Sequence, residues 1–560
     1  MSDRTYVLSY DIGTTGVKTC LFEVEDEIKL IAAEMEGYSL TVYPDGGAEQ
    51  DPDEWWSAIC NTTKRLMNST SVSTSEIAGI SFCSQMQGLV LVDKDGQPVR
   101  KAMSYMDQRA KKQIKELMAY GPQIAGAYIP KLLKSLQITG AVSASVKDPV
   151  YKYKWVEENE PENFARTYKW LDVKEYIICR MTDKFVMTRD SAFGTLLYDV
   201  RKGKEGWSPE MLKMFNVKPE HMAEIIDSTA LVGGLTEKAA DDLGLCEGTP
   251  VFGGGGDASL IGVGAGAVAL GDTHIYCGTS GWVTTVVDKN IVDTSAMIAA
   301  IVGAQNGKLN YFAELETAGK CLEWVKDHLA LDEIDIFLEK TDVASSKESI
   351  FTSLYDYMSH VINKTPAGCG GVIFTPWLHG NRCPFEDPNA RGMFFNISLE
   401  TGKTELIRAV VEGTCMHLRW FLETEDKKTK TSDVLRFVGG GALSDVTSQI
   451  LADCTGRTVE VVASPQNVGA VGAAVISAVG LGMIGSIEEA KKLVPAKKTF
   501  IPNPSLKPIY DKNFAVFKNL SRATRRILRL STADKRFKPP FCVNHIFDSA
   551  LEKVQYPVLY

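Results

Sequence analysis

The sequence predicts an α/β protein of two domains, and the chain length and an internal repeat are the observations that predict it. At 560 residues the chain is too long for one hydrophobic core, so two domains are the default expectation. The segments at 6–22 (YVLSYDIGTTGVKTCLF) and 274–287 (HIYCGTSGWVTTVV) both read as strand, tight glycine-rich turn, strand. A duplicated α/β unit would explain this likeness, and chance similarity between two short turns is the alternative.

The composition is that of an ordinary globular protein, with 44% hydrophobic and 23% charged residues and a formal net charge of -9. No long basic block precedes the C-terminal tail, so no nucleic-acid partner is expected. The 12 cysteines include no CxxC pair, and the seven histidines include no HExxH motif. Neither a zinc site nor a disulfide framework is therefore expected, and the scattered thiols and the lack of an apolar signal segment at the N-terminus favour a cytoplasmic protein.

One uncharged segment has the length of a short membrane span. It covers residues 468–485 (VGAVGAAVISAVGLGMIG). Its five glycines and the lack of flanking basic residues favour a tightly packed buried helix that then breaks. No membrane span is expected.

The first glycine-rich turn has the residues of a phosphate-binding loop. Its glycines allow a sharp turn whose N–H groups point into a concavity that suits an anion. The hydroxyls of Thr14 and Thr15 add donors, Lys18 adds a positive charge and Asp11 adds a carboxylate. The second turn has Tyr276 in the place of Asp11 and a valine in the place of Lys18. The two halves are therefore predicted to have specialised, with metal and charge in the first.

Two familiar nucleotide-binding motifs are not supported. The P-loop pattern GxxxxGK[ST] is absent, and the GVGAGA at 262–267 matches the dinucleotide pattern without a clean preceding strand. At 434–445 (VLRFVGGGALSD), a predicted strand runs into three glycines and then a helix, with Ser444 as its N-cap and Gly456 as its end. Such a strand end lets a flat ring or a phosphate approach the backbone, and close packing of strand against helix is the alternative.

Several motifs follow one another along the chain. They are DIGTTGVK (11–18), EQDPDEWW (49–56), SQMQGLVLVD (84–93), GGGGDASLIGVGAG (253–266), GTSG (278–281), GNRCPFEDPNARG (380–392), EGTCMHLRWFL (412–422) and GGGALSDVTSQILADCTGRTV (439–459). In this order they resemble the FGGY family of carbohydrate kinases, with the xylulokinases as the nearest pattern. The resemblance covers residues 5 to about 500 and implies two ribonuclease H-like domains of the actin, hexokinase and Hsp70 type with a catalytic cleft between them. The domains are predicted as 1–255 (sugar and first phosphate loop), 256–505 (nucleotide) and a C-terminal extension at 506–560.

The resemblance implies transfer of the γ-phosphoryl group of ATP to a sugar or polyol hydroxyl, with Mg²⁺ as the cofactor. The position that matches the catalytic base is Asp257, a carboxylate after four glycines that can accept the proton of the attacking hydroxyl. Asp11 is implied as the metal-site carboxylate, acting through water. The implied ATP contacts are Gly13, Thr14, Thr15 and Lys18 from the first half and Gly278, Thr279, Gly440, Gly441 and Asp445 from the second.

The implied sugar pocket departs from the xylulokinase pattern in three places. Gln87 stands where those enzymes have histidine, residues 105–109 (YMDQR) replace Trp-Asn-Asp-Gly-Arg, and Ala258 follows the catalytic aspartate where asparagine is frequent. A xylulose-like ketopentose is the first expectation for the substrate, and ribulose, erythritol and glycerol stay open. The pocket residues implied by the resemblance are Gln85, Met86, Gln87, Asp107 and Arg109, together with Asp257.

Two hypotheses from other classes also stay open: an ATPase switch of the actin or Hsp70 kind, and a sugar sensor that no longer phosphorylates. The joint presence of Asp11, Lys18 and Asp257 argues against a catalytically dead protein. The expected partners are ATP and a small-molecule sugar or polyol, with a homodimer as an open alternative. The basic stretch 518–538 (KNLSRATRRILRLSTADKRFK) predicts a helix packed on the neighbouring domain, and a contact with a lipid surface or a partner is the alternative.

Overall fold

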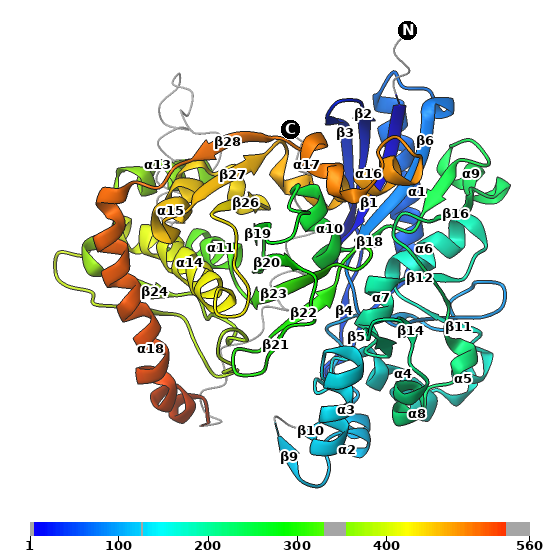
Figure 1. Cartoon of the computed structure of the whole chain (residues 1–560), viewed down its shortest axis with the longest axis horizontal. Helices are drawn as coiled ribbons and strands as arrows, with labels where there is room; N and C mark the ends of the chain where they lie inside the picture. Colours follow the sequence, from blue (N-terminus) through cyan, green and yellow to red (C-terminus); the bar gives the residue numbers. More distant parts are fainter. Residues whose placement is uncertain (1–4, 125–126, 330–353, 534–560) are drawn as a thin grey trace, which may run out of the picture.

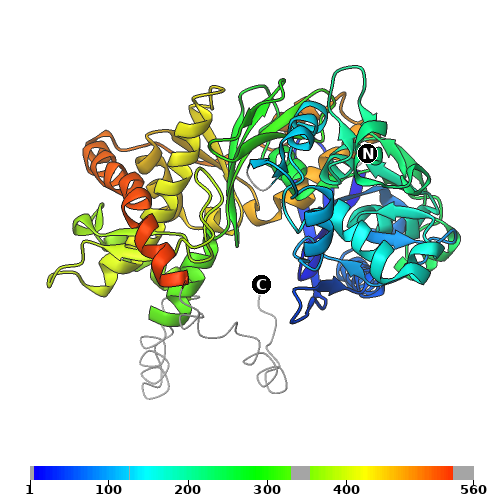
Figure 2. The same ribbon diagram turned by 90° about the horizontal axis from the view of Figure 1, so that it is seen from below.

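The computed structural model describes residues 5–124, 127–329 and 354–533, and these form two halves that are each centred on a mixed β-sheet (Figure 1). The first sheet is drawn mainly in blue, and the second is drawn in green to orange. The view from below shows the two halves side by side (Figure 2). The α/β class and the two-part architecture predicted from the sequence are therefore confirmed.

The first sheet has the strand order β16-β17-β6-β1-β2-β3, and β18 also pairs with β6. β1 and β2 form the predicted antiparallel hairpin around the glycine-rich turn, and β3 continues the antiparallel run. On the other side of β1, β6 is parallel, and so is β17 beyond it. The strands are β1 (Thr5–Ile12), β2 (Gly16–Val24), β3 (Ile28–Gly37), β6 (Ile77–Ser84), β16 (Leu231–Gly234), β17 (Pro250–Phe252) and β18 (Gly255–Gly256).

The second sheet repeats the arrangement of the first. Its order is β21-β22-β23-β20-β19-β26-β27-β28, and the run β23-β20-β19-β26-β27 has the same antiparallel and parallel pairings as β3-β2-β1-β6-β17. The similar hairpins at 6–22 and 274–287 thus belong to a duplicated α/β unit. The strands are β19 (Thr273–Cys277), β20 (Gly281–Val287), β21 (Val292–Asp293), β22 (Ile298–Val302), β23 (Leu309–Leu315), β26 (Val434–Val438), β27 (Thr458–Val462) and β28 (Ala496–Phe500).

Helices cover the outer faces of both sheets. In the first half, α1 (Pro52–Ser69) packs on β2 and β3, and in the second half α14 (Lys403–Glu425) packs on α15 (Asp445–Thr455). The long helix α18 (Lys507–Ala533) runs along the left edge in Figure 1. Its residues Tyr510, Phe514, Phe517 and Leu520 are buried in the core of the second half. The helix predicted at 518–538 is therefore present as far as Ala533, and its packing on the domain is seen as far as Ser521. Residues 534–560 lie outside the described residues, and the domain boundaries at 255 and 505 stay predictions.

Shorter elements complete the two halves. Those of the first half lie mostly between β3 and β16, and they build a separate apolar cluster beside the sheet. The helices are α2 (Lys111–Leu117), α3 (Ile129–Thr139), α4 (Pro149–Asn159), α5 (Pro161–Arg166), α6 (Val173–Thr182), α7 (Arg189–Gly194), α8 (Pro209–Phe215), α9 (Glu237–Leu243), α11 (Gly319–Leu329), α13 (Leu354–Lys364) and α17 (Ala490–Leu493). The strands are β4 (Thr41–Val42), β5 (Ala48–Gln50), β7 (Val90–Val92), β8 (Ala102–Met103), β9 (Gln123–Ile124), β10 (Ala127–Tyr128), β11 (Lys169–Leu171), β12 (Val186–Thr188), β13 (Tyr198–Asp199), β14 (Gly206–Trp207), β15 (Glu224–Ile226), β24 (Ile373–Thr375) and β25 (Met393–Phe395).

Two helices join the halves. α10 (Asp257–Gly264) and α16 (Val468–Gly480) share one buried cluster with Val7 and Phe22 of the first sheet and with Val438 and Val462 of the second. Although α16 comes late in the chain, it packs on β1 and β6, where Figure 1 draws it in orange beside the blue strands. The uncharged segment at 468–485 is therefore the predicted buried helix, which ends at Gly480. Among the described residues, no helix has the length and apolar character needed to span a membrane.

Glycines allow α10 and α16 to approach each other at backbone distance. A Cβ atom added to Gly472 of α16 would lie 2.3 Å from the carbonyl oxygen of Leu260 in α10. A Cβ atom added to Gly264 of α10 would lie 1.9 Å from the carbonyl oxygen of Val468. Both distances are well below van der Waals contact, so a methyl group at either position requires the helices to move apart.

We expect Gly472→Ala to destabilise the protein, although alanine is the better helix former. In a free helix interior this exchange stabilises by about 1 kcal/mol, but overpacking against a backbone carbonyl costs about 1–3 kcal/mol. Differential scanning calorimetry should show a lower Tm. The control is Ser477→Ala in the same helix, which adds no atom and removes a buried hydroxyl that has no hydrogen-bond partner among the described residues. An unchanged or higher Tm for Gly472→Ala would show that the two helices are not in close contact.

Candidate active site

Hydrogen bonds from side chains to its carbonyl groups fix the turn of the first hairpin. The N–H of Gly13 donates to the carbonyl of Gly16 at 2.9 Å, which closes the turn. The Tyr38 hydroxyl donates to the carbonyls of Gly13 and Gly16, and the Gln50 side chain donates to the carbonyl of Thr14 at 2.8 Å. Among the described residues, the N–H groups of Thr14 and Thr15 have no acceptor. The turn thus presents free amide donors on its outer side, as an anion-binding loop does.

Asp11 and Lys18 are opposite each other on β1 and β2, at the base of this turn. Burial raises the pKa of the Asp11 carboxyl, and the positive charge of Lys18 partly offsets the rise. The Lys18 amine donates to Asn467 Oδ1 at 2.8 Å and to the carbonyl of Gln466 at 3.1 Å, just before α16 begins. A Cβ atom on Gly469 would lie 2.9 Å from Asp11 Oδ2. The N-terminus of α16 therefore lies directly beside both charged residues.

Asp257 is the first residue of α10. Its Oδ1 accepts the N–H of Ala258 at 2.8 Å. Burial raises the pKa of Asp257 to about 7, and the negative charges of Asp11 and Asp190 contribute to the rise. A carboxyl group that titrates near neutral pH suits proton transfer at physiological pH. Asp190, which the sequence analysis did not identify, accepts the N–H of Gly256 at 2.7 Å and so supports the backbone next to Asp257.

The predicted sugar-pocket segment 85–87 lies between the first turn and Asp257. Gln85 is buried and donates to the side chain of Gln50 at 2.9 Å, the residue that also holds the carbonyl of Thr14. A Cβ atom on Gly256 would lie 2.1 Å from Met86 Sδ, so Met86 packs on the residue that precedes Asp257. The structure thus places Met86 beside the predicted catalytic residue, and Gln85 on the side of the first turn.

Asp107 and Arg109 form a buried ion pair. Arg109 Nη2 lies 2.7 Å from Asp107 Oδ2 and 2.5 Å from Glu49 Oε1, and the guanidinium stacks 4.4 Å from the ring centroid of Trp155. Asp107 is fully buried and also accepts the N–H of Ala48 at 2.8 Å. The described contacts of Asp107 and Arg109 are therefore with the protein, and a contact of these two with the sugar stays a prediction.

The second hairpin faces the first. Gly278 closes its turn by donating to the carbonyl of Ser280 at 2.9 Å, and Thr279 is exposed. Tyr276 stacks on Trp282 with ring centroids 4.0 Å apart, and its hydroxyl lies 2.2 Å from the position of a Cβ atom on Gly278. Burial and the charges of Asp11 and Asp257 raise the pKa of Tyr276. The residue that takes the place of Asp11 in the second repeat therefore lies near both carboxylates of the site.

The glycines after β26 lie beside this second turn. A Cβ atom on Gly441 would lie 2.9 Å from the Cβ atom of Cys277, the residue before Gly278, whereas one on Gly440 would meet nothing within 4 Å. Ser444 caps α15 through the N–H of Thr447, and Gly456 ends the helix, as predicted. Asp445 lies further along, with its side chain 57% exposed and paired with Lys498 at 2.7 Å. Gly278, Thr279, Gly440 and Gly441 are thus adjacent, and Asp445 lies at their edge.

Asp11 and Asp257 are the carboxylates that this site offers to a cation. Among the described residues, no group of three or more His, Cys, Asp or Glu side chains could hold a metal ion. Mg²⁺ that enters with ATP needs fewer protein ligands, because water and phosphate oxygens supply most of its coordination sphere. The donor set fits a magnesium–nucleotide complex better than a resident metal ion.

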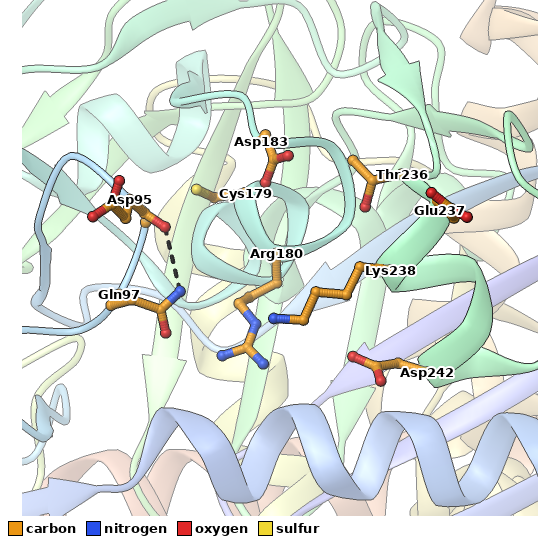
Figure 3. Close-up of a pocket in the computed structure, with 10 residues that line it drawn as sticks. Asp95, Gln97, Cys179, Arg180, Asp183, Thr236, Glu237, Lys238 and Asp242 are labelled. Atoms are coloured by element: carbon orange, nitrogen blue, oxygen red, sulfur yellow. Dashed lines mark hydrogen bonds between the residues drawn. The ribbon is translucent and has the colours of Figure 1, made fainter.

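A cavity of about 180 Å³ lies elsewhere, between the turn at 93–97, the end of α6 and the start of α9 (Figure 3). Its lining includes Arg180 and Lys238 together with the carboxylates of Asp95, Asp183 and Asp242. None of the predicted site residues lines it. The cavity therefore does not belong to the candidate active site.

We expect Arg109→Met to destabilise the protein, because it leaves the buried carboxylate of Asp107 without its cation, whereas Glu49 keeps its ion pair with Arg100. Removing one partner of a buried ion pair costs about 3 kcal/mol or more. A lower Tm measured without any ligand would show the structural role. Arg166→Met is the matched control, since the Arg166 side chain is 59% exposed and lies 3.7 Å from Asp93 Oδ2. Equal Tm values for the two variants would argue against this role for Arg109.

Comparison with known proteins identifies two family models in the chain. Residues 6–264 match the N-terminal domain of the FGGY family of carbohydrate kinases, and residues 274–481 match the C-terminal domain of the same family. The xylulose kinase of Bacillus subtilis (strain 168) is 28% identical over 535 residues, which cover 95% of this chain and 99% of that protein. The gluconokinase of Bacillus licheniformis is 26% identical over 93% of this chain and 96% of that protein. The crystal structure of ligand-bound xylulose kinase from Lactobacillus acidophilus superimposes with a TM-score of 0.79, at 25% identity over 93% of this chain and 98% of the other.

Proposed function

The chain belongs to the FGGY family of carbohydrate kinases, and from this premise we propose that it phosphorylates a hydroxyl group of a ketopentose such as xylulose, with ATP as the phosphoryl donor and Asp257 as the catalytic base. It has the two-domain fold of that family and is a sugar kinase. The observation that supports the proposal most is the position of Asp257. This carboxyl starts α10 beside Met86, its pKa is raised to about 7, and the hairpin with Asp11 and Lys18 lies next to it.

In the proposed reaction, a sugar hydroxyl oxygen attacks the γ-phosphorus of ATP. The new O–P bond forms as the bond from the γ-phosphorus to the bridging oxygen breaks, and ADP leaves. Asp257 accepts the proton that the hydroxyl loses. Its carboxylate is held by the N–H of Ala258, and the backbone before it is held by Asp190, so the base is fixed in place before the substrate binds.

The first hairpin supplies donors for the phosphates. The N–H groups of Thr14 and Thr15 and the Lys18 amine, which has one donor beyond its two described bonds, would neutralise charge on the β- and γ-phosphates. Gly13 gives the turn its shape. When Mg²⁺ is bound with ATP it supplies charge neutralisation on the phosphate oxygens, and Asp11 would hold it through water.

The second half would hold the rest of the nucleotide. Gly278 and Thr279 lie at the turn that faces Asp11 and would bind phosphate, and Gly440 has open space in which a flat ring can approach the backbone. Gly441 and Asp445 would border the adenosine. ATP would thus bind between the two hairpins, with the sugar on the side of residues 85–87.

The identity of the sugar rests on the relatives and on the pocket. Proteins named xylulose kinase and gluconokinase match this chain at similar identity, so the names of the relatives do not separate these substrates. Gln87 offers two donors and one acceptor without a titratable charge, which suits an uncharged polyhydroxylated substrate. Xylulose is therefore the first candidate, and ribulose, erythritol, glycerol and gluconate are its competitors.

The experiment that tests this proposal is an ADP-release assay with xylulose and these four competitors. We expect xylulose to give the highest kcat/KM. A higher kcat/KM for another compound would make that compound the preferred substrate. Turnover that no sugar or polyol stimulates would contradict the proposed function.

We expect Asp257→Asn to lower kcat by about 10² or more while the KM values for ATP and sugar change little, because the amide keeps the shape but cannot accept the proton. Steady-state kinetics with the preferred sugar provide the measurement. The control is Asp241→Asn, an exposed aspartate in α9, which should retain full activity. Near-normal kcat in Asp257→Asn would remove this residue from the role of base.

We expect Lys18→Ala to raise the KM for ATP by about tenfold or more, with a smaller effect on the KM for sugar, because a charged donor to phosphate is lost. Asp11→Ala should weaken the Mg²⁺-dependent activity, because the carboxylate that would hold the ion is lost. Lys29→Ala, an exposed lysine on β3, is the control for Lys18. If Lys18→Ala leaves the KM for ATP unchanged and Asp11→Ala leaves the Mg²⁺-dependent activity unchanged, the first hairpin is not a phosphate-binding loop.

A further inference from the structure

Gln87 has a backbone conformation that residues with a side chain rarely adopt. Its φ angle is +64°, in the left-handed region that favours glycine. Such a conformation persists where the surroundings hold it, and it occurs often at ligand-binding sites. Both polar groups of the Gln87 backbone are bound by buried charged side chains, those of Asp172 and Lys152.

Asp172 holds the amide side of Gln87. Its Oδ2 accepts the N–H of Gln87 at 2.8 Å, and its Oδ1 accepts the N–H of Gly88 at 2.9 Å and that of Val173 at 2.8 Å. Asp172 is also the N-cap of α6, which fixes the carboxylate on a rigid element. A Cβ atom on Gly88 would lie 2.8 Å from Asp172 Oδ1, so only glycine lets the carboxylate come this close.

Lys152 holds the carbonyl side. Its side chain comes from α4 and is completely buried, and its amine donates to the carbonyl of Gln87 at 3.0 Å and to that of Ser104 at 2.8 Å. No carboxylate among the described residues lies within salt-bridge distance of this amine. Burial lowers the pKa of Lys152 to about 8, against the opposing charges of Asp107 and Asp172. Burying an ammonium group costs free energy. The hydrogen bonds of this one go to Gln87 and to Ser104, in and next to the two segments that contain the predicted sugar-binding residues.

We propose that Lys152 and Asp172 are positioning residues that hold Gln87 in its left-handed conformation, and that they thereby determine which hydroxyl pattern the sugar pocket accepts. The inference rests on the proposed function. Gln87 is one of the pocket residues that the family resemblance implies, and its neighbour Met86 packs on Gly256, one residue before Asp257. A rotation of the Gln87 backbone would move its amide away from the reacting hydroxyl.

Lys152→Met and Asp172→Asn are the test variants, measured with the preferred sugar of the wild type and with its closest competitor. We expect the KM for the preferred sugar to rise by about tenfold and the ratio of kcat/KM between the two sugars to shift by about fivefold or more, while the KM for ATP changes by less than about twofold. Lys154→Met is the matched control, because Lys154 is on the same helix and buried, but donates to Glu157 and to the carbonyl of Asn216.

A double-mutant cycle separates positioning from general structural support. If Lys152 acts through Gln87, then Lys152→Met in a Gln87→Gly background should change the KM for sugar by less than about twofold, since glycine adopts the left-handed conformation unaided. If the effects of Lys152→Met and Gln87→Gly on the KM for sugar simply multiply, the proposal is overturned. It is also overturned if neither single variant changes the ratio of kcat/KM between the two sugars. If Lys152→Met does not fold, Asp172→Asn takes its place in the double-mutant cycle. If neither variant folds, the pair serves stability alone and the proposal is wrong. Failure of the proposed function is distinct, since the wild type would then show no sugar-dependent turnover.

Discussion

The close contact between α10 and α16 is the constraint on which the rest of this structure depends. The two helices pack at backbone distance because Gly264 and Gly472 carry no side chain there. They lie between two sheets that share a run of five strands with the same pairings, and each helix begins at the candidate active site. Because helix N-termini present unpaired N–H groups and partial positive charge, this packing directs two such ends toward the place where phosphate would bind.

The chemistry of the site follows from this arrangement. Asp257 starts α10, and the segment before α16 binds Lys18 through Asn467. Asp11 and Asp257 are brought close in a buried region, and each resists ionisation because of burial, the latter also because of its acidic neighbours. A divalent cation that enters with the nucleotide would offset the negative charge of these carboxylates, which is a physical reason for a site that takes the magnesium complex of ATP.

The sequence was sufficient for features that are local or repeated. The two hairpins, the Ser444 cap and the buried helix after Val468 follow from turn residues, capping chemistry and hydrophobicity within short segments. The residues that support the site were missed for the opposite reason. Asp190 and Lys152 act through hydrogen bonds to backbone atoms far away in the sequence, and such contacts leave no periodicity or motif. The hydrogen bond between Lys18 and the segment before α16 joins residues far apart in the chain, and the sequence could not predict it either.

Asp107 and Arg109 have protein partners that their motif does not reveal. The resemblance implies contacts with sugar hydroxyls, and these stay a prediction; in the structure Arg109 pairs with Asp107 and with Glu49, and Trp155 covers the guanidinium. Residue type states what a side chain can bind, whereas burial decides which of its partners are within reach. Met86, in contrast, belongs to an identifiable motif and packs on Gly256, the residue before Asp257.

The most direct test of the central claim is to follow the γ-phosphate by phosphorus NMR with Mg-ATP and xylulose. A sugar kinase predicts a phosphomonoester resonance that grows in step with ADP and requires the sugar. If the γ-phosphoryl group appears only as inorganic phosphate, at a rate that does not depend on any sugar or polyol, the result would contradict the account and favour an ATPase switch.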